Sequence, residues 1–119
     1  MNRFIAAVVI SVAPLWFGLP LEGALVGADG RIVFLRVHEL GTGYGPPEDF
    51  LDTEVVVKLD TEPGKSFGLQ LRDDAKYPAR EAMLGLLRDA FANNWLVRLE
   101  YEIPPGKTNG VIVRVILTK

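Results

Sequence analysis

The residues that could do chemistry in this chain are few. The chain has one histidine, His38, and beyond residue 28 it has one serine, Ser66. With an aspartate these two could nominally form a hydrolytic triad, but both fall within strand-like segments and neither sits on a sharp nucleophile turn. A typical zinc site needs several histidine or cysteine ligands, and the chain has no cysteine. We therefore predict no catalytic residue, no metal site and no cofactor, and we expect that the protein is not an enzyme.

A glycine-rich segment is the first candidate for ligand binding. Residues 41–50 contain three glycines in five positions and then two prolines, which excludes regular structure. The segment superficially resembles a phosphate loop, but Pro46 and Pro47 forbid the helix that such a loop needs. The functional interpretation is a loop with Tyr44 at its tip, able to stack on a sugar or fill a partner's pocket, helped by the polar side chains of Thr42, Glu48 and Asp49. The alternative is a long hairpin connection that contributes little to the core.

Acidic residues gather in the same region, at Glu48, Asp49, Asp52 and Glu54, and again at Asp73 and Asp74. Calcium needs six or more oxygen ligands, and this spacing fits no calcium loop. Solvated loops explain both clusters.

Residues after the predicted helix supply the remaining candidates. Trp95 could stack on a sugar or a base, although a tryptophan at a helix–strand junction is more often part of the core. Arg98 and Glu100 alternate on the outer face of one predicted strand, and Arg114 is expected to do the same on the last. We expect these three to make contacts across strands or between subunits.

One amphipathic helix organises the elements that must position these residues. Its apolar positions recur at steps of three and four between Pro78 and Asn93, which predicts one buried stripe: Ala79, Ala82, Met83, Leu86, Leu87, Ala90 and Phe91. Proline suits the first turn of a helix, because its missing N–H would have no helical partner there. Leu86 and Leu87 lie in the middle of the stripe, so both are expected to be buried.

Five strand-like segments surround the helix, three before it and two after it: residues 30–40, 53–60, 66–72, 95–103 and 111–117. The order β-β-β-α-β-β in about 90 residues, one domain by length, matches the five-stranded oligonucleotide/oligosaccharide-binding (OB) barrel, a mainly β fold with one helix. An open α+β sheet with the helix across one face fits the same elements and is the alternative.

The N-terminus indicates export. A short basic stretch precedes a 16-residue apolar run from Phe4 to Leu19, and Val26-Gly27-Ala28 resembles a cleavage site. We predict a signal peptide at residues 1–28 and a barrel domain at residues 29–119, secreted or periplasmic and free of the membrane after cleavage. An uncleaved anchor is the alternative, although the run is short for a span and Pro14 interrupts it.

The charge balance argues against nucleic acid as a partner. The whole chain has 13 basic and 15 acidic residues, and 12 and 14 remain beyond residue 28, so the net charge stays at −2. Nucleic-acid binding usually needs a basic face that neutralises phosphates.

Three stretches carry a family resemblance: Gly-Arg-Ile-Val at residues 30–33, the small-residue helix at 82–91 and Val-Arg-Leu-Glu-Tyr at 97–101. With the signal peptide, this pattern resembles small exported bacterial barrel proteins such as the receptor-binding B subunits of AB5 toxins, the subtilase cytotoxin type in particular. Those subunits usually carry a disulfide, which this chain lacks. The resemblance implies a non-catalytic binding module that recognises a glycan or a protein partner. The alternative is a structural or assembly protein of the cell envelope, and in either case the chain could form a homo-oligomer.

Overall fold

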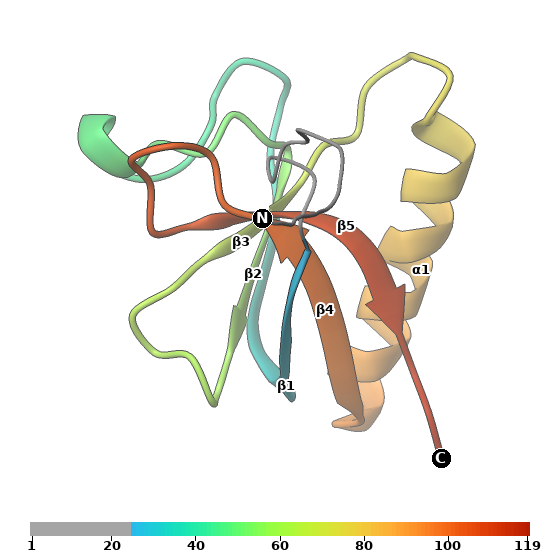
Figure 1. The fold of residues 1–119 in the computed structure, drawn as a ribbon. Helices are drawn as coiled ribbons and strands as arrows, with labels where there is room; N and C mark the ends of the chain where they lie inside the picture. The colour runs from blue at the N-terminus through green and yellow to red at the C-terminus, as the bar shows by residue number, and fades with distance from the viewer. Residues whose placement is uncertain (1–24) are drawn as a thin grey trace, which may run out of the picture.

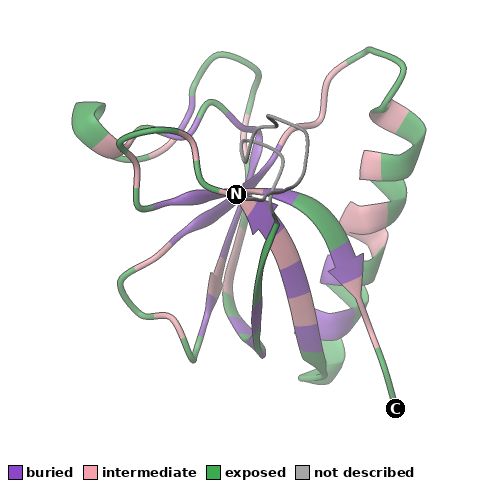
Figure 2. Cartoon of the chain, viewed as in Figure 1, coloured by how far each residue is buried: buried purple, intermediate pink, exposed green. Residues whose placement is uncertain are grey.

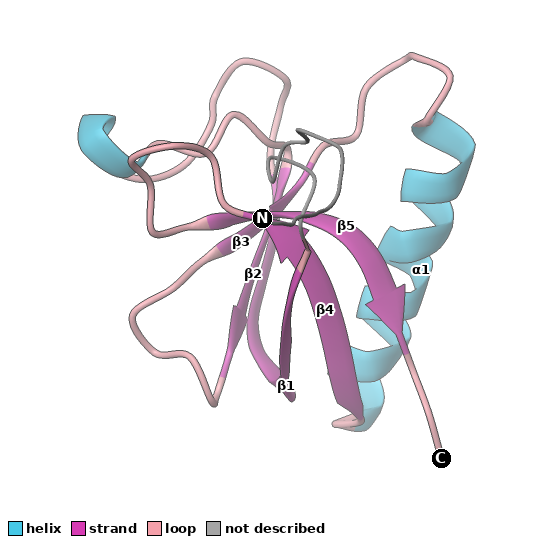
Figure 3. Cartoon of the chain, in the orientation of Figure 1, coloured by secondary structure: helices cyan, strands magenta, loops and turns pink. Residues whose placement is uncertain are grey.

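The computed structural model describes residues 25–119, which form one closed five-stranded barrel with a single long helix beside it (Figures 1 and 3). In chain order the elements are β1 (Val26–Val37), a 3-10 turn (Pro47–Asp49), β2 (Val55–Leu59), β3 (Phe67–Leu69), α1 (Tyr77–Asn93), β4 (Leu96–Glu102) and β5 (Gly110–Ile116). The predicted β-β-β-α-β-β order is confirmed. No helix in this part of the chain has the length and apolarity needed to cross a membrane.

The barrel closes because β1 pairs on both sides. Its first half, from Val26 to Arg31, runs antiparallel to β4, and its second half, from Ile32 to Val37, runs antiparallel to β2. The order around the barrel is β1-β2-β3-β5-β4, with β3 and β5 parallel and all other neighbours antiparallel. The alternative of an open sheet is therefore wrong, because β4 returns to β1.

β1 begins earlier and ends earlier than residues 30–40, the range that its sequence predicts. It also changes the set of side chains that faces the core. Ile32 is buried, but a register shift between Ile32 and Phe34 turns Val33 outward, and Leu35 packs against the core instead. A β-bulge of this kind adds one residue to a strand and bends it. The regular alternation expected of a strand is therefore interrupted at this point.

The core of the barrel takes side chains from every strand and from α1, and Figure 2 shows buried positions on each of the five strands. The rings of Phe67 and Tyr101 meet edge to face, with centroids 4.8 Å apart. On β2 the core residues are Val55, Val57 and Leu59. Val56, which points to the opposite face, is completely buried as well. A second layer must therefore cover the outer face of β2.

α1 begins and ends close to the predicted positions. Pro78 lies in the first turn, and Asn94 ends the helix in the left-handed conformation, with its N–H donating to the carbonyls of Ala90 and Phe91. Asparagine tolerates this conformation better than most residues, so it is suited to ending a helix.

The buried stripe of α1 is narrower than the sequence predicts. Leu87 and Ala90 are fully buried, whereas Leu86 is 37% exposed and Phe91 is more exposed still. Successive helical residues are about 100° apart around the axis, so Leu87 points toward the barrel while Leu86 lies at the edge of the contact. In Figure 2 the side of α1 away from the strands is exposed along its length. The expectation that Leu86 is buried is wrong.

This difference between neighbouring leucines can be measured. Leu87→Ala should lower the free energy of unfolding by about 2–5 kcal/mol, because it leaves a cavity in the core. Leu86→Ala should cost less than about 1 kcal/mol, since part of this side chain already contacts water. Denaturant titration of both variants provides the comparison, and equal losses would contradict the packing described here.

Candidate functional site

The chain between β1 and β2 forms the layer that covers the outer face of β2. Tyr44 and Leu51 exchange two backbone hydrogen bonds, of 3.0 and 2.7 Å, and Leu51 is buried. Gly43 has a left-handed φ of +65°, and the ring of Phe50 lies where a side chain at Gly43 would be. Glycine is therefore required at position 43 for both reasons. Residues 41–50 contribute no side chain to the core of the barrel, as the hairpin interpretation expects, although Gly43 is itself buried.

Asp49 ties this layer to the loop before β5. Its carboxylate accepts the backbone N–H groups of Thr108 and Asn109, at 2.8 and 3.0 Å, and the Asn109 amide donates back to the Asp49 carbonyl. The Asn109 side chain also accepts the N–H of Ser66. These backbone N–H groups lower the pKa of Asp49, because they stabilise the ionised carboxylate. Asp49 therefore holds this layer to the loop before β5, and its predicted role in ligand binding stays a prediction.

Thr42 and Glu48, the other polar residues predicted on this loop, are both exposed. The backbone N–H of Thr42 donates to the carbonyl of Glu39, which makes a turn. The structure brings neither side chain into the bonded network of Asp49, so their role in binding stays a prediction.

Tyr44 lies against the barrel beside two cations. Its ring is 6.4 Å from that of Phe34 on β1, measured between centroids. The Arg36 guanidinium of β1 and the Lys58 ammonium of β2 each lie 5.4 Å from the Tyr44 ring centroid. The Lys58 ammonium beside the phenol, with further contributions from Ser66 and Arg36, lowers the pKa of Tyr44. Tyr44 is half-buried within this group, and it is not the free loop tip that the sequence suggests.

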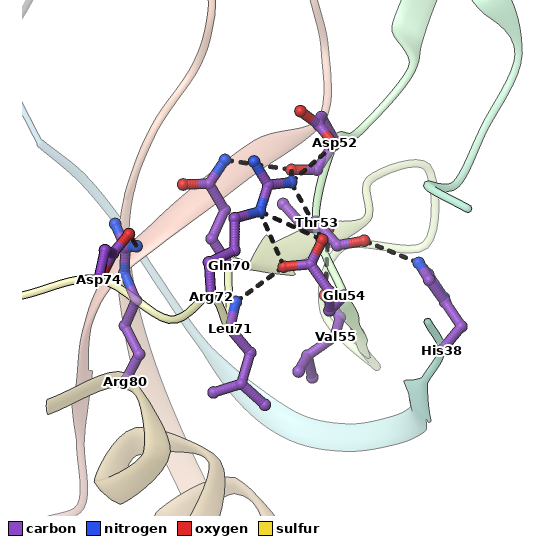
Figure 4. Close-up of polar contacts among 10 residues, drawn as sticks. All are labelled: His38, Asp52, Thr53, Glu54, Val55, Gln70, Leu71, Arg72, Asp74 and Arg80. Carbon is purple, nitrogen blue, oxygen red and sulfur yellow. Dashed lines mark hydrogen bonds and ion pairs between the residues drawn. The ribbon is translucent and has the colours of Figure 1, made fainter. Parts of the chain in front are cut away.

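The densest polar cluster surrounds a buried carboxylate, that of Glu54 (Figure 4). Glu54 accepts the backbone N–H of Leu71 at 2.8 Å and the Arg72 guanidinium at 3.0–3.3 Å. Arg72 also bonds Asp52, through its carbonyl at 2.7 Å and its carboxylate at 2.6 Å. The pKa of Arg72 is raised by these two acidic partners. The cluster therefore clamps the end of the covering layer onto the segment that follows β3.

His38 belongs to the same region and is committed to the backbone. Its Nε2 lies 2.7 Å from the carbonyl of Thr53, so this nitrogen carries the proton and donates it. The other ring nitrogen, Nδ1, is buried without a hydrogen-bond partner in residues 25–119. Within residues 25–119 His38 makes its hydrogen bond to the Thr53 carbonyl and none to the Ser66 hydroxyl, so the two side chains do not form a nucleophile–base pair in this structure. Residues 25–119 also contain no group of three acidic or histidine side chains able to hold a metal.

Trp95 lies at the junction of α1 and β4, and its side chain is 48% exposed. With Leu96, Leu117, Thr118 and Lys119 it lines a hollow of about 510 Å³. The assignment of Trp95 to the core is therefore wrong. Its role in ligand binding stays a prediction, and the hollow is the surface where a ligand could contact the indole.

The three polar residues predicted on the outer strands contact one another. Glu100 pairs with Arg98 at 3.2 Å on its own strand and with Arg114 on β5. Arg98 reaches further, to Asp29 on β1 at 3.0 Å, and its guanidinium lies directly over Gly27. These ion pairs cross β1, β4 and β5 on the outside of the barrel. Their predicted role between subunits stays a prediction.

Two solved structures are similar to this chain in fold. One is porcine heat-labile enterotoxin in complex with an inhibitor, at 15% sequence identity, and the other is human heat-labile enterotoxin in complex with a blood group A antigen analog, at 17%. In both cases the TM-score is 0.58, and the match covers 82% of this chain and 88% of the enterotoxin chain. The chain shares the enterotoxin fold. The resemblance to AB5 toxin subunits is therefore confirmed at the level of fold. No protein-family model and no curated protein matches the sequence.

Sequence reasoning missed the two cations beside Tyr44. A signal for them existed, because Phe34 and Arg36 alternate on one face of the first predicted strand and Lys58 occupies the outer face of the second. What the sequence could not supply is the register, which places Lys58 directly opposite Phe34.

The clamp on Glu54 can be tested by removing its cation. Arg72→Ala should lower the free energy of unfolding by about 2–3 kcal/mol, somewhat below the cost for a fully buried pair because Arg72 is partly exposed. Arg88→Ala is the matched control: Arg88 is exposed and makes no ion pair within residues 25–119, so a change of at most about 0.5 kcal/mol is expected. Equal losses in thermal or urea denaturation would show that the clamp contributes nothing.

Proposed function

We propose that this chain is an exported, non-catalytic module that binds a glycan, with the indole of Trp95 as its stacking surface. The observation that carries the proposal is the hollow beside this tryptophan. A large aromatic side chain that stays half exposed next to apolar walls is typical of a binding surface. Leu96 and Leu117 supply the apolar walls, and Thr118 and Lys119 supply polar groups at the same place.

The chemistry of a sugar suits this arrangement. A sugar ring has an apolar C–H face that can lie on an indole, while its hydroxyl groups need hydrogen-bond partners such as the Thr118 hydroxyl and the Lys119 ammonium. A tryptophan has few rotatable bonds, so it loses little side-chain entropy when it is held by a ligand.

The enterotoxin structures support a binding function by analogy. One of them holds a blood group A antigen analog, so a chain of this fold takes part in a glycan complex. The bonding of the polar side chains also supports a non-catalytic role. His38 is bonded to the Thr53 carbonyl, and Glu54 is bonded to the Leu71 N–H and to Arg72. A site whose polar groups are already bonded to each other has few left to act on a substrate.

Self-association is the second candidate function, since the apolar surface around Trp95 could instead be covered by another copy of this chain. The substitution Trp95→Ala distinguishes glycan binding from self-association. Under the proposal, Trp95→Ala weakens glycan capture and leaves the solution mass unchanged. Under the assembly alternative it lowers the solution mass.

The binding proposal is tested on a glycan array, followed by titration of the best ligand. Trp95→Ala should weaken binding by about tenfold or more, because stacking on an aromatic ring contributes on the order of 1–2 kcal/mol. Phe91→Ala is the control, because Phe91 is also an exposed aromatic residue but does not line the hollow. Equal weakening by the two changes, or none by Trp95→Ala, would refute the role of this surface.

We also propose that residues preceding the barrel act as a signal peptide and that cleavage leaves Val26, Gly27 and Ala28 in place. The predicted signal peptide lies mostly outside the described residues, but its last three residues belong to β1. They pair with Tyr101, Glu100 and Leu99, and Ala28 is 5% exposed. Cleavage after Ala28 would remove these pairings from the closed barrel.

Intact mass spectrometry of the protein from its native host tests the cleavage position. The expected mass corresponds to a first residue at or before Val26. A chain that starts at Asp29 would contradict the position, and a full-length chain held in the membrane fraction would contradict cleavage itself.

A further inference from the structure

We propose that Arg36, Lys58 and Tyr44 form a binding site for a tetrahedral oxyanion, of the kind carried by a sulfate ester or a phosphate monoester. This site uses residues that the Trp95 hollow does not use, and it does not depend on the glycan-binding function proposed above.

The register of two strands brings the three side chains together. Lys58 on β2 pairs with Phe34 on β1, and Arg36 lies two positions further along β1, on the same outer face as Phe34. The ring of Tyr44 lies over this face, 5.4 Å from each cation, and the Lys58 ammonium is also 5.6 Å from the Phe34 ring centroid. Two cations therefore share one phenol ring on the surface of the barrel.

Neither cation has an acidic partner in the described part of the chain. Arg72, Arg80, Arg98 and Arg114 all make ion pairs with carboxylates within 4.0 Å, whereas Arg36 and Lys58 make none there. Two like charges beside the same ring repel each other, and the repulsion is stronger where protein excludes water on one side. A bound anion would offset this repulsion.

The lowered pKa of Tyr44 indicates that its surroundings favour negative charge. Its pKa is lowered, and the charged groups responsible are Lys58 from β2 and Arg36 from β1, with the Ser66 hydroxyl as a neutral contributor. The hydrogen bond from Lys58 is the largest contribution, and the charges of Lys58 and Arg36 that add to it would also attract an anion that arrives from solution. No carboxylate contributes to this shift in the pKa.

The donor set favours a tetrahedral oxyanion over a carboxylate. A guanidinium, an ammonium and a phenolic O–H give three separate donor groups, and a sulfate ester or phosphate monoester offers three terminal oxygens. A carboxylate offers two oxygens and would leave one donor unused.

The site is held in place before any ligand arrives. The backbone of Tyr44 is fixed by its two hydrogen bonds to Leu51, and Phe34 supports one side of the ring. Arg36 is exposed and Lys58 is half-buried, so both cations are reachable from solvent. Because the position of Tyr44 is already fixed, little entropy is lost in ordering this residue on binding.

The experiment titrates the mature protein with sodium sulfate and sodium phosphate at constant ionic strength, by NMR chemical shifts. Arg36→Gln and Lys58→Gln should each weaken sulfate binding by about tenfold or more, because each removes a charge-assisted hydrogen bond. Arg88→Gln and Trp95→Ala are the controls and should leave sulfate binding unchanged. Comparable weakening by Arg88→Gln, or no saturable binding in the millimolar range, would overturn the proposal.

A second readout follows the ionisation of tyrosine by absorbance at 295 nm. Saturating sulfate should raise the pKa of Tyr44, because the bound anion cancels the field of the two cations. Tyr44→Phe identifies the responsible group, since it should remove the component that titrates at the lowest pH. An unchanged titration in sulfate would mean that the anion does not occupy this site.

The source of the oxyanion is distinguished with three sugars: galactose 6-sulfate, galactose 6-phosphate and galactose. Both charged sugars should compete with inorganic sulfate, and galactose should not. The charged sugar that binds more tightly identifies the oxyanion, sulfate or phosphate, that the site prefers. Competition by galactose alone would overturn the proposal and leave the Trp95 surface unaffected.

Discussion

The structure depends on one strand that is shared between two neighbours. β1 gives its first half to β4 and its second half to β2, and the bulge after Ile32 lets it bend between them. Without that bend the two ladders would lie in one open sheet, and the apolar faces of β2 and β4 would have no common interior. Barrel closure pairs the backbone groups that an open edge would leave exposed. It also brings Asp29, Arg98 and Arg114 from three strands to one outer surface.

Local pattern predicted most of the elements because each has one buried side. The alternation in β2 and β4 and the three-and-four spacing in α1 are both set by the period of the backbone. The patterns did not predict the burial of residues that lie outside the barrel interior. Val56 points away from that interior and Glu54 directly precedes β2, yet both are buried, and Glu54 is bonded to Leu71 and Arg72 after β3. Leu86 shows the opposite error, since an apolar residue on a helix need not face the part of the surface that is covered.

The candidate surfaces were harder to predict than the fold. Tyr44 and Trp95 were identifiable from residue type and from position in a loop or at a junction, and the structure places both at the surface with part of the ring accessible. Asp49 looked like a free acceptor because no local pattern reveals a partner about sixty residues away in the chain. The cations beside Tyr44 depend on strand register, and register is settled by long-range packing.

The parallel junction between β3 and β5 has a consequence for how the barrel moves. Phe67 and Gly68 alone pair with β5, which makes this the shortest ladder around the barrel. Hydrogen exchange at these amides should therefore be the fastest among the paired strands, since local opening starts where the fewest bonds must break. Asn109 accepts the N–H of Ser66 and is itself held by Asp49, so these two side chains act as a latch across the weakest joint. Once these bonds are broken, the backbone groups of β3 and β5 at this joint would be free to pair with another strand.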